Sequence, residues 1–283
     1  MLSRRTLLQI AAATAAGIHP ATARAQNRRS PYAPFRMGLQ SYSLRAFKVE
    51  DALKITRELG LRYWESFEGH LPITDDPRTL ATYRELLRAH NVTLAAFGVL
   101  GFSTDEADAR RKFQFAKAMG IPTLTASPAP EALPLLDRLV EEYRVHIAIH
   151  NHGPEDRLYG RIQQGIDVLK GRHPRIGMCI DTGHYLRAGE DPLQAARAFQ
   201  KRLFALHLKD VRLRPDAPPE FTEIGKGNLN TPALLALLRQ QRYPGIIALE
   251  YEEHPENPAP YIQQCLDAVR DAIRKAQNLR PQP

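Results

Sequence analysis

Residues 176–184 read Ile176-Gly177-Met178-Cys179-Ile180-Asp181-Thr182-Gly183-His184. The mostly apolar run before Asp181 is typical of a strand that is covered on both faces, as parallel strands are. Asp181 stands where such a strand would end, and Gly183 would let the chain turn sharply just after it. The pattern therefore predicts a buried strand whose carboxyl end carries polar groups.

Three more strand-like runs end in a polar side chain. They are residues 147–150, which end in His150, residues 204–207, which end in His207, and residues 246–250, which end in Glu250. Because side chains alternate along a strand, each polar residue should share its inward face with the residue two positions before it. These inward neighbours are small, and so leave room for a site: Ala148, Cys179, Ala205 and Ala248.

Strand-like and helix-like segments alternate along the rest of the chain. We expect strands at residues 37–42, 62–67, 92–97, 122–126, 145–150, 176–181, 203–208 and 245–251, and helices at 49–59, 79–90, 105–119, 131–143, 162–169, from 191, 231–241 and 260–276. Such alternation predicts an α/β fold with a parallel sheet, and eight repeats close most simply into a (β/α)8 TIM barrel. The alternative is a doubly wound open sheet, but no glycine-rich phosphate loop follows the first expected strand.

The first 25 residues have the pattern of an export signal. Ser3-Arg4-Arg5-Thr6-Leu7-Leu8 is a twin-arginine start, and an apolar run and the small-x-small site Ala23-Arg24-Ala25 follow it. We therefore expect a signal peptide at residues 1–25, a linker at 26–36 and one barrel domain at 37–280. The protein would be periplasmic or secreted, and would meet the twin-arginine translocase during export. The alternative is that residues 1–25 form an amphipathic first helix of the fold.

The composition narrows the range of partners. The chain has 283 residues, a formal net charge of +8 and two cysteines, so it is no disulfide scaffold. Its Lys and Arg residues are scattered among acidic residues, which argues against nucleic-acid binding. Outside the leader, no stretch is long and apolar enough to predict stable membrane insertion. We expect a small-molecule partner, and the sequence leaves the oligomeric state open.

The polar strand ends form a candidate metal site. In a barrel, the carboxyl ends of neighbouring strands meet at one rim, so His150, Asp181, His207 and Glu250 would converge there. Two imidazoles and two carboxylates suit one divalent cation, which we expect to be Mn²⁺, with Zn²⁺, Co²⁺ or Fe²⁺ as alternatives. Hydrogen-bonded rim histidines are the other interpretation. His152 has the same strand parity as His150 and could replace it as a ligand.

Six short motifs, taken in order, carry a family resemblance. They are Gly38-Leu39-Gln40-Ser41-Tyr42-Ser43-Leu44-Arg45, His150-Asn151-His152-Gly153, Asp181-Thr182-Gly183-His184, Leu206-His207-Leu208-Lys209-Asp210, Glu223-Ile224-Gly225-Lys226-Gly227 and Leu249-Glu250-Tyr251-Glu252. Together they resemble the xylose-isomerase-like sugar isomerases and epimerases, a metal-dependent TIM-barrel superfamily that also contains endonuclease IV. The resemblance covers essentially all of the chain after the leader. It implies a metal held by Glu, Asp, His and Glu; Asp181, His207 and Glu250 match the last three, and His150 replaces the first.

That replacement bears on the reaction. The resemblance implies that in the epimerases two metal-bound Glu residues stand on opposite faces of the sugar and exchange a proton at one carbon. His150 would bind metal as a neutral ligand but would be a poor partner in that exchange, whereas Glu250 remains a candidate catalytic base.

Three functions follow from this comparison. We expect an exported sugar isomerase or epimerase-type enzyme that acts on an unphosphorylated keto-sugar through a metal-stabilised enediolate. The alternative is a 3-keto-glycoside lyase that works by β-elimination, and the second alternative is a non-catalytic sugar-binding barrel. DNA repair of the endonuclease IV kind is disfavoured by the expected export, the missing basic stripe and too few additional His and Glu residues.

Further side chains are expected around the sugar. His184 resembles a substrate-binding or second-metal histidine, and Lys209 would either stabilise an enolate oxygen or pair with Asp210. The proline-rich connection at residues 212–230 is predicted to form a lid, from which Lys226 would reach a substrate oxygen. The catalytic candidates beside Glu250 are therefore His152 and Lys209, and the substrate-binding candidates are His184, Glu155, Glu65 and Lys226.

Overall fold

The computed structural model describes residues 30–278. The predicted signal peptide, at residues 1–25, lies outside this range, so the leader and the domain limits drawn from it stay predictions. From Pro31 onward the chain forms one compact unit.

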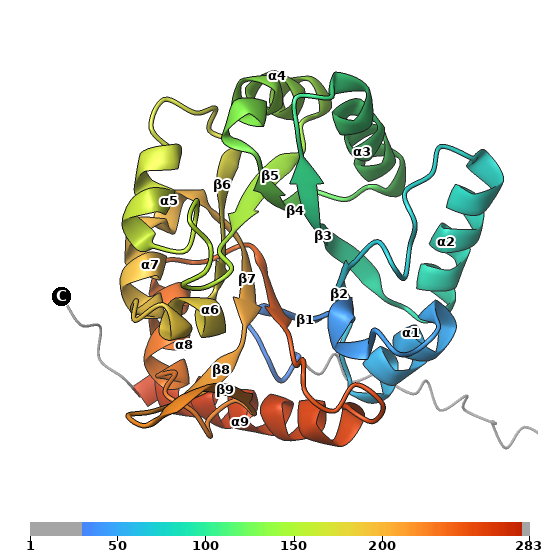
Figure 1. Ribbon diagram of the computed structural model, residues 1–283. Coiled ribbons are helices and arrows are strands. Elements are labelled where there is room, and N and C mark those ends of the chain that lie inside the picture. Colours follow the sequence, from blue (N-terminus) through green and yellow to red (C-terminus); the bar gives the residue numbers. More distant parts are fainter. Residues whose placement is uncertain (1–29, 279–283) are drawn as a thin grey trace, which may run out of the picture. The chain divides into compact units, whose positions relative to one another are not determined.

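Eight parallel strands close into a barrel, as the sequence predicts, and helices surround it (Figure 1). The strands run around the ring in the order β1-β10-β7-β6-β5-β4-β3-β2. They are β1 (Arg36–Gln40), β2 (Tyr63–Ser66), β3 (Thr93–Phe102), β4 (Thr123–Pro128), β5 (His146–His150), β6 (Ile176–Asp181), β7 (Leu203–Leu208) and β10 (Ile246–Leu249). The helices between them are α1 (Val49–Glu58), α2 (Pro77–Ala89), α3 (Glu106–Met119), α4 (Leu133–Tyr143), α5 (Ile162–Val168), α7 (Pro192–Ala198), α8 (Thr231–Gln240) and α9 (Ala259–Asn278).

Two additions to the simple barrel lie beyond the carboxyl ends of the strands. A short helix, α6 (Thr182–Arg187), follows β6 directly, and the sequence did not predict it. The predicted lid segment is largely an antiparallel hairpin of β8 (Asp210–Arg214) and β9 (Ala217–Thr222), which Figure 1 shows beside α9. Both additions border the side of the barrel where the polar strand ends meet.

Helix boundaries follow from local capping chemistry. The Asp191 carboxylate accepts a hydrogen bond from the backbone N–H of Leu193 at 2.9 Å, and Asn230 accepts one from Ala233 at 3.2 Å. In both α7 and α8, Pro occupies the first turn, where its missing N–H costs nothing. Gly120 ends α3 in the left-handed conformation with φ of +69°, which glycine adopts without strain. These signals explain why the predicted helix limits lie close to the observed ones.

The hydrophobic interior consists of two cores, one outside and one inside the barrel, as the predicted alternation of side chains along the strands requires. Met178 and Ile180 belong to the large core between the barrel and its helices. Cys179 belongs to a separate small core inside the barrel, directly before Asp181 on the inward face. The other buried members of this inner core are mostly alanines: Ala96, Ala148, Ala205, Ile246 and Ala248.

Gly183 has a different role from the predicted one. It lies within α6 and does not adopt a left-handed conformation. A Cβ atom at this position would stand only 2.7 Å from the Cβ of Lys209. Glycine is therefore needed for the close approach of α6 to the end of β7, and not for a turn.

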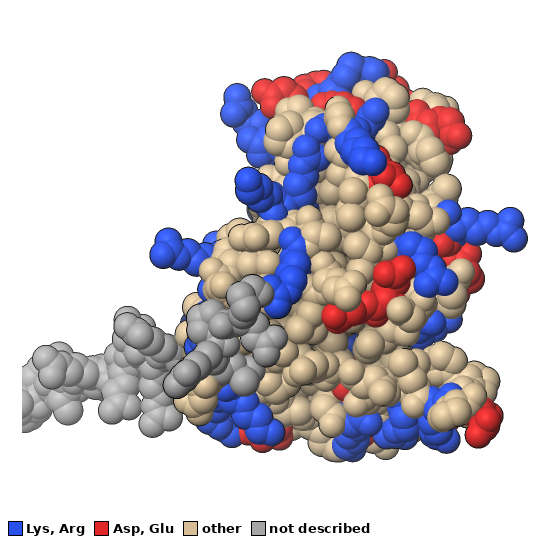
Figure 2. All heavy atoms as spheres, turned by 90° about the vertical axis from the view of Figure 1, so that its left-hand side faces the viewer, with Lys and Arg blue, Asp and Glu red and all other residues tan. Residues whose placement is uncertain are grey.

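Charged side chains are mixed on the surface that Figure 2 displays. Basic and acidic groups are interspersed on this face, without one continuous basic band. Among the described residues, no helix has the length and apolar character needed to cross a membrane.

Candidate metal centre and cavity

A cavity of about 610 Å³ opens at the carboxyl ends of the barrel strands. Strands from both halves of the ring contribute to its wall. One side is rich in ionisable groups, and the other combines aromatic and backbone surfaces. The lining residues are Gln40, Tyr42, Phe67, Glu68, Gly98, Val99, His150, His152, Glu155, His184, Lys209, Glu250 and Glu252.

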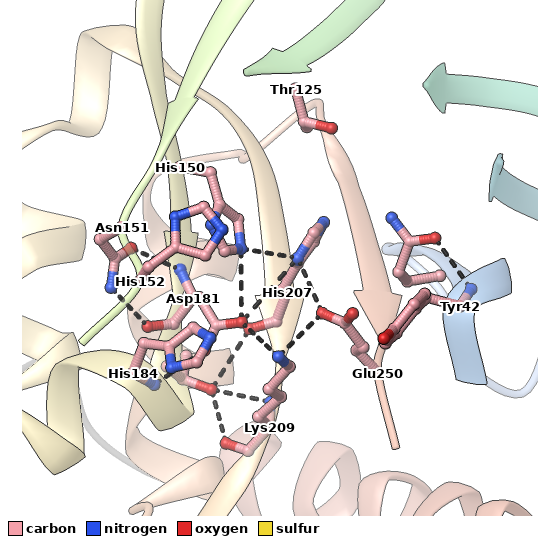
Figure 3. Close-up of polar contacts among 12 residues, drawn as sticks. Tyr42, Thr125, His150, Asn151, His152, Asp181, His184, His207, Lys209 and Glu250 are labelled. Atoms are coloured by element: carbon pink, nitrogen blue, oxygen red, sulfur yellow. Dashed lines mark hydrogen bonds and ion pairs between the residues drawn. The ribbon is translucent and has the colours of Figure 1, made fainter. Parts of the chain in front are cut away.

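The structure brings the four predicted metal ligands together at the base of this cavity (Figure 3). One ligand atom from each of His150, Asp181, His207 and Glu250 lies within 4.8 Å of the others. His207 Nδ1 is 3.0 Å from both His150 Nε2 and Glu250 Oε2, and 3.9 Å from Asp181 Oδ2. His150 Nε2 lies 3.5 Å from the same Asp181 oxygen. The alignment of β6 with β7, which pairs Asp181 with His207, produces this convergence.

The donor set fits a divalent cation. Ligands bonded to zinc at about 2.0–2.2 Å stand roughly 3–4 Å from one another, which is the spacing of these atoms. Asp181 Oδ2 and Glu250 Oε2 are buried, and both face the cluster. Buried carboxylates are costly unless positive charge stabilises them. A protonated lysine, Lys209, lies beside both oxygens, and a divalent ion would balance the charge of the second carboxylate.

Lys209 supplies one positive charge beside the ligands. Its Nζ lies 3.1 Å from Asp181 Oδ2 and 3.1 Å from Glu250 Oε2, and it also pairs with Glu252. Burial lowers the pKa of Lys209, but these three carboxylates outweigh it and raise the pKa above its ordinary value. Lys209 therefore stays protonated at the cavity wall. The alternative partner, Asp210, instead accepts backbone N–H groups, including those of Gly225, Gly227 and Leu229.

The two histidines at the end of β5 occupy different places. His150 is the strand-five member of the ligand cluster, and its burial holds its pKa well below the ordinary value, so the ring is neutral. His152 is not part of that cluster. Its ring centroid lies 4.4 Å from that of His150, and it lines the cavity. The geometry therefore favours His150 as the ligand and leaves His152 facing the substrate space.

His184 lies at the cavity edge with a fixed hydrogen-bond partner. Arg187 Nη1 is 3.0 Å from His184 Nδ1, and Arg187 Nη2 donates to Glu155 Oε1 at 2.8 Å. Because a guanidinium can only donate, Nδ1 must accept, and a neutral His184 then carries its proton on Nε2. This tautomer is a hydrogen-bond donor and does not suit a second metal. Glu155 lines the cavity, but its carboxylate is engaged by Arg187.

The structure places two predicted substrate-binding residues away from the cavity wall. Glu65 is fully buried, with its Oε1 3.0 Å from His207 Nε2. Lys226 is directed to Glu223 Oε1 at 2.8 Å and to Gln264 Oε1 at 3.0 Å. Neither side chain lines the cavity, because β2 directs Glu65 into the barrel and the turn after β9 directs Lys226 towards α9.

Sequence reasoning missed several residues of the site. Asn151 accepts the Asp181 N–H at 2.8 Å and donates to the Asp181 carbonyl at 3.1 Å, which joins the ends of β5 and β6. Asn151 lies between two candidate histidines in the sequence, and this position could have identified it as a residue of the site. Arg187 would have been found if α6 had been predicted, because it follows His184 by three positions on that helix. Tyr42 follows β1 and Val99 lies within β3, and no charged residue or His marks either position in the sequence.

The chain belongs to the xylose isomerase-like TIM barrel family, whose sequence profile matches residues 53–272. It is similar to the inosose dehydratase of Bacillus thuringiensis (strain Al Hakam), with 26% identity over 153 residues that cover 48% of this chain and 51% of the relative. The chain therefore spans about half the length of this curated relative.

Solved structures share the fold. The IOLI protein, in a crystal structure with a bound zinc atom, has a TM-score of 0.71 and 17% identity over 87% of this chain and all of that one. A D-tagatose 3-epimerase-like protein has a TM-score of 0.64 and 17% identity over 84% of this chain and all of that one. At this level of identity the likeness concerns the fold.

Proposed function

We propose that the protein is a metal-dependent lyase that eliminates a β-substituent from an unphosphorylated keto-sugar or keto-glycoside. The inosose dehydratase relative supports elimination chemistry. From the sequence alone, isomerisation or epimerisation was the preferred function and elimination the alternative. The environment of His150 reverses this order.

The asymmetry of the ligand cluster carries the proposal. Burial opposes ionisation of Glu250, but Lys209 and His207 outweigh it and hold its pKa below the ordinary value, so it is a carboxylate at the cavity wall. The ligand on β5, three strands further around the ring from β10, is the neutral His150. When His150 binds a cation through Nε2, that lone pair cannot also take a proton, whereas Glu250 contributes Oε2 to the cluster and keeps its second oxygen, Oε1. A reaction that needs one base suits this site better than an exchange between two.

The proposed reaction is balanced within the site. Glu250 takes the proton from the carbon next to the ketone, and the electrons of that C–H bond form the new C=C bond. The C–O bond at the β-carbon breaks, and its oxygen leaves with the bonding electrons. The proton on Glu250 then passes to this oxygen, which departs as water or an alcohol, and the enzyme returns to its starting protonation state.

The other residues bind and orient the substrate. A divalent cation held by the four ligands would polarise the ketone and acidify the neighbouring C–H bond. Lys209 would stabilise negative charge that develops on a substrate oxygen, because it is held protonated beside the cavity. His184, which presents Nε2–H, would donate a hydrogen bond to a hydroxyl or to the leaving oxygen. Tyr42 and Phe67, packed edge to face at 5.4 Å, would form an apolar wall for the sugar ring.

The predicted export signal is part of this proposal. A twin-arginine leader would place the enzyme outside the cytoplasm, where unphosphorylated glycosides are the expected sugars. Residues 1–29 lie outside the described part of the chain, so this step rests on the sequence.

The test is product analysis with metal-loaded protein in D₂O. A panel of 3-keto-glycosides and keto-inositols is incubated with protein loaded with Mn²⁺, Co²⁺ or Zn²⁺, and NMR follows the products. We expect release of the alcohol or water together with an unsaturated ketone, and loss of turnover after chelation. Deuterium entering recovered or epimerised sugar without elimination would establish the epimerase instead. Equal sugar binding with and without metal, and no exchange, would establish a binding barrel.

A further inference from the structure

Behind the metal ligands lies a buried carboxylate for which the proposed reaction has no use. Glu65, on β2, projects into the barrel with no solvent-exposed surface. Its Oε1 lies 3.0 Å from His207 Nε2 on β7 and accepts a hydrogen bond of 2.5 Å from the hydroxyl of Thr125 on β4. Three strands thus meet at one carboxylate beneath the cavity floor.

The two nitrogens of His207 face different surroundings. Nδ1 is the atom in the ligand cluster, with His150 Nε2 and Glu250 Oε2 both at 3.0 Å. Nε2 lies 3.0 Å from Glu65 Oε1, and the thiol of Cys179 on β6 is a further neighbour of the ring. Both nitrogens face a carboxylate, and a carboxylate oxygen can only accept. Once a cation takes the lone pair of Nδ1 together with Glu250, the ring proton can lie only on Nε2, where Glu65 accepts it.

We propose that Glu65 is a positioning residue that selects the metal-binding tautomer of His207 and increases the basicity of its Nδ1. Thr125 donates a hydrogen bond to the same carboxylate oxygen and so holds it in place. Carboxylates that accept the outer N–H of a metal-bound histidine act in this way in general. The effect matters more here than with a carboxylate ligand on β5, because the neutral His150 contributes no negative charge to the ion. The inference rests on the metal centre and is independent of which sugar reaction occurs.

The first measurement is metal affinity in the absence of sugar. Zn²⁺ and Co²⁺ titrations of the full mature chain, in competition with a chromophoric chelator at fixed pH, compare wild type with Glu65→Ala, Glu65→Gln and Thr125→Val. We expect Glu65→Ala to weaken binding by about 10- to 100-fold, the usual range for such outer partners. Glu65→Gln keeps an acceptor oxygen and should lose less, and Thr125→Val should also lose less.

The second measurement separates positioning from folding. Nitrogen-15 NMR of the histidine rings is recorded on the metal-free protein at a pH above the raised pKa of His207, where the ring is neutral. The Nε2–H form of His207 should be more populated in wild type than in Glu65→Ala, in which the population shifts towards Nδ1–H. Thr56→Val is the matched control, because Thr56 is equally buried but bonds only the Ala52 carbonyl, at 2.7 Å. It should leave affinity and tautomer unchanged.

Two results would overturn the inference. One is wild-type metal affinity in a folded Glu65→Ala protein. The other is weakened affinity with an unaltered His207 tautomer and an equal loss in Thr56→Val, which would indicate general destabilisation. If no sugar is turned over but the affinities follow the expected order, the positioning role stands and the proposed function falls.

Discussion

The two halves of the barrel use the same backbone geometry for different purposes. On β5, β6, β7 and β10 the strand ends supply His150, Asp181, His207 and Glu250, whose ligand atoms converge. Strands β1 to β3 and the segments that follow them contribute mainly aromatic, aliphatic and backbone surfaces to the cavity, together with Gln40 and one acidic residue, Glu68. The first half therefore provides most of the charge, and the other provides most of the shape.

The difference shows how function is divided on this fold. Inward side chains that are ionisable need partners, and the charged half supplies them through Lys209 and neighbouring strands. The apolar half has no such constraint, so it can vary to suit a substrate. Glu65 is the exception, because it belongs to β2 but acts on His207 of β7.

Among substitutions in the metal-ligand half of the barrel, Glu250→Gln is expected to reduce turnover most. The amide keeps an oxygen towards the cluster but cannot take a proton, so kcat should fall by about 10²- to 10⁴-fold. Metal titration and turnover, measured on the same sample, separate loss of the base from loss of the ion. A reduction of less than tenfold with full metal occupancy would show that Glu250 is not the base.

His150→Glu would make the two sides of the ligand cluster more alike. A carboxylate on β5, in addition to Asp181 and Glu250, should raise proton exchange or epimerisation relative to elimination by about 10²-fold, the lower end of the rate contribution of one general base. Product ratios by NMR in D₂O are the measurement. His146→Glu places the same acid at the other end of β5, outside the cavity lining, and should not change the ratio.

Lowering the pH should weaken the metal site. Burial alone would lower the pKa of His207, but Cys179, Glu65 and Glu250 together raise it well above the ordinary value. Below that raised pKa a proton occupies the ring and competes with the cation, so affinity should fall by about tenfold per pH unit for one displaced proton. Above it, affinity should level off. Titrations across this range that show no slope would contradict the assignment of His207 as a ligand.

The smallest effect on the kinetics is expected for substitutions in the half of the cavity wall that β1 to β3 and the segments after them supply. Phe67→Ala removes the aromatic partner of Tyr42 from the cavity wall. It should raise KM by up to about tenfold, the factor that corresponds to the free energy of one aromatic pair. kcat and metal affinity should stay near wild type, because Phe67 touches no ligand. As a control, Leu158→Ala removes an exposed hydrophobic side chain that lies outside the cavity lining, and it should leave KM unchanged. A fall in metal affinity in Phe67→Ala would mean that the two halves are not independent.

The roles of particular residues show where sequence reasoning stopped. Strand periodicity located Asp181 and His207 correctly on the inward face, but it gave no distances around the ring. It therefore could not show that Glu65 stands behind His207, or that Lys226 turns away from the cavity. Those contacts join residues that are 142 and 38 positions apart, and no local pattern encodes them.

By itself the sequence determined the barrel, the approximate positions of its eight strands and of the helices between them, and the four side chains that meet at its rim. Local periodicity and capping fix such features, because each depends on residues a few positions apart. Only the tertiary structure decided that His150 rather than His152 lies in the ligand cluster, that Arg187 sets the tautomer of His184, and that Lys209 pairs with the ligands. These contacts depend on closure of the barrel, because closure brings side chains from strands that are distant in the sequence within bonding distance.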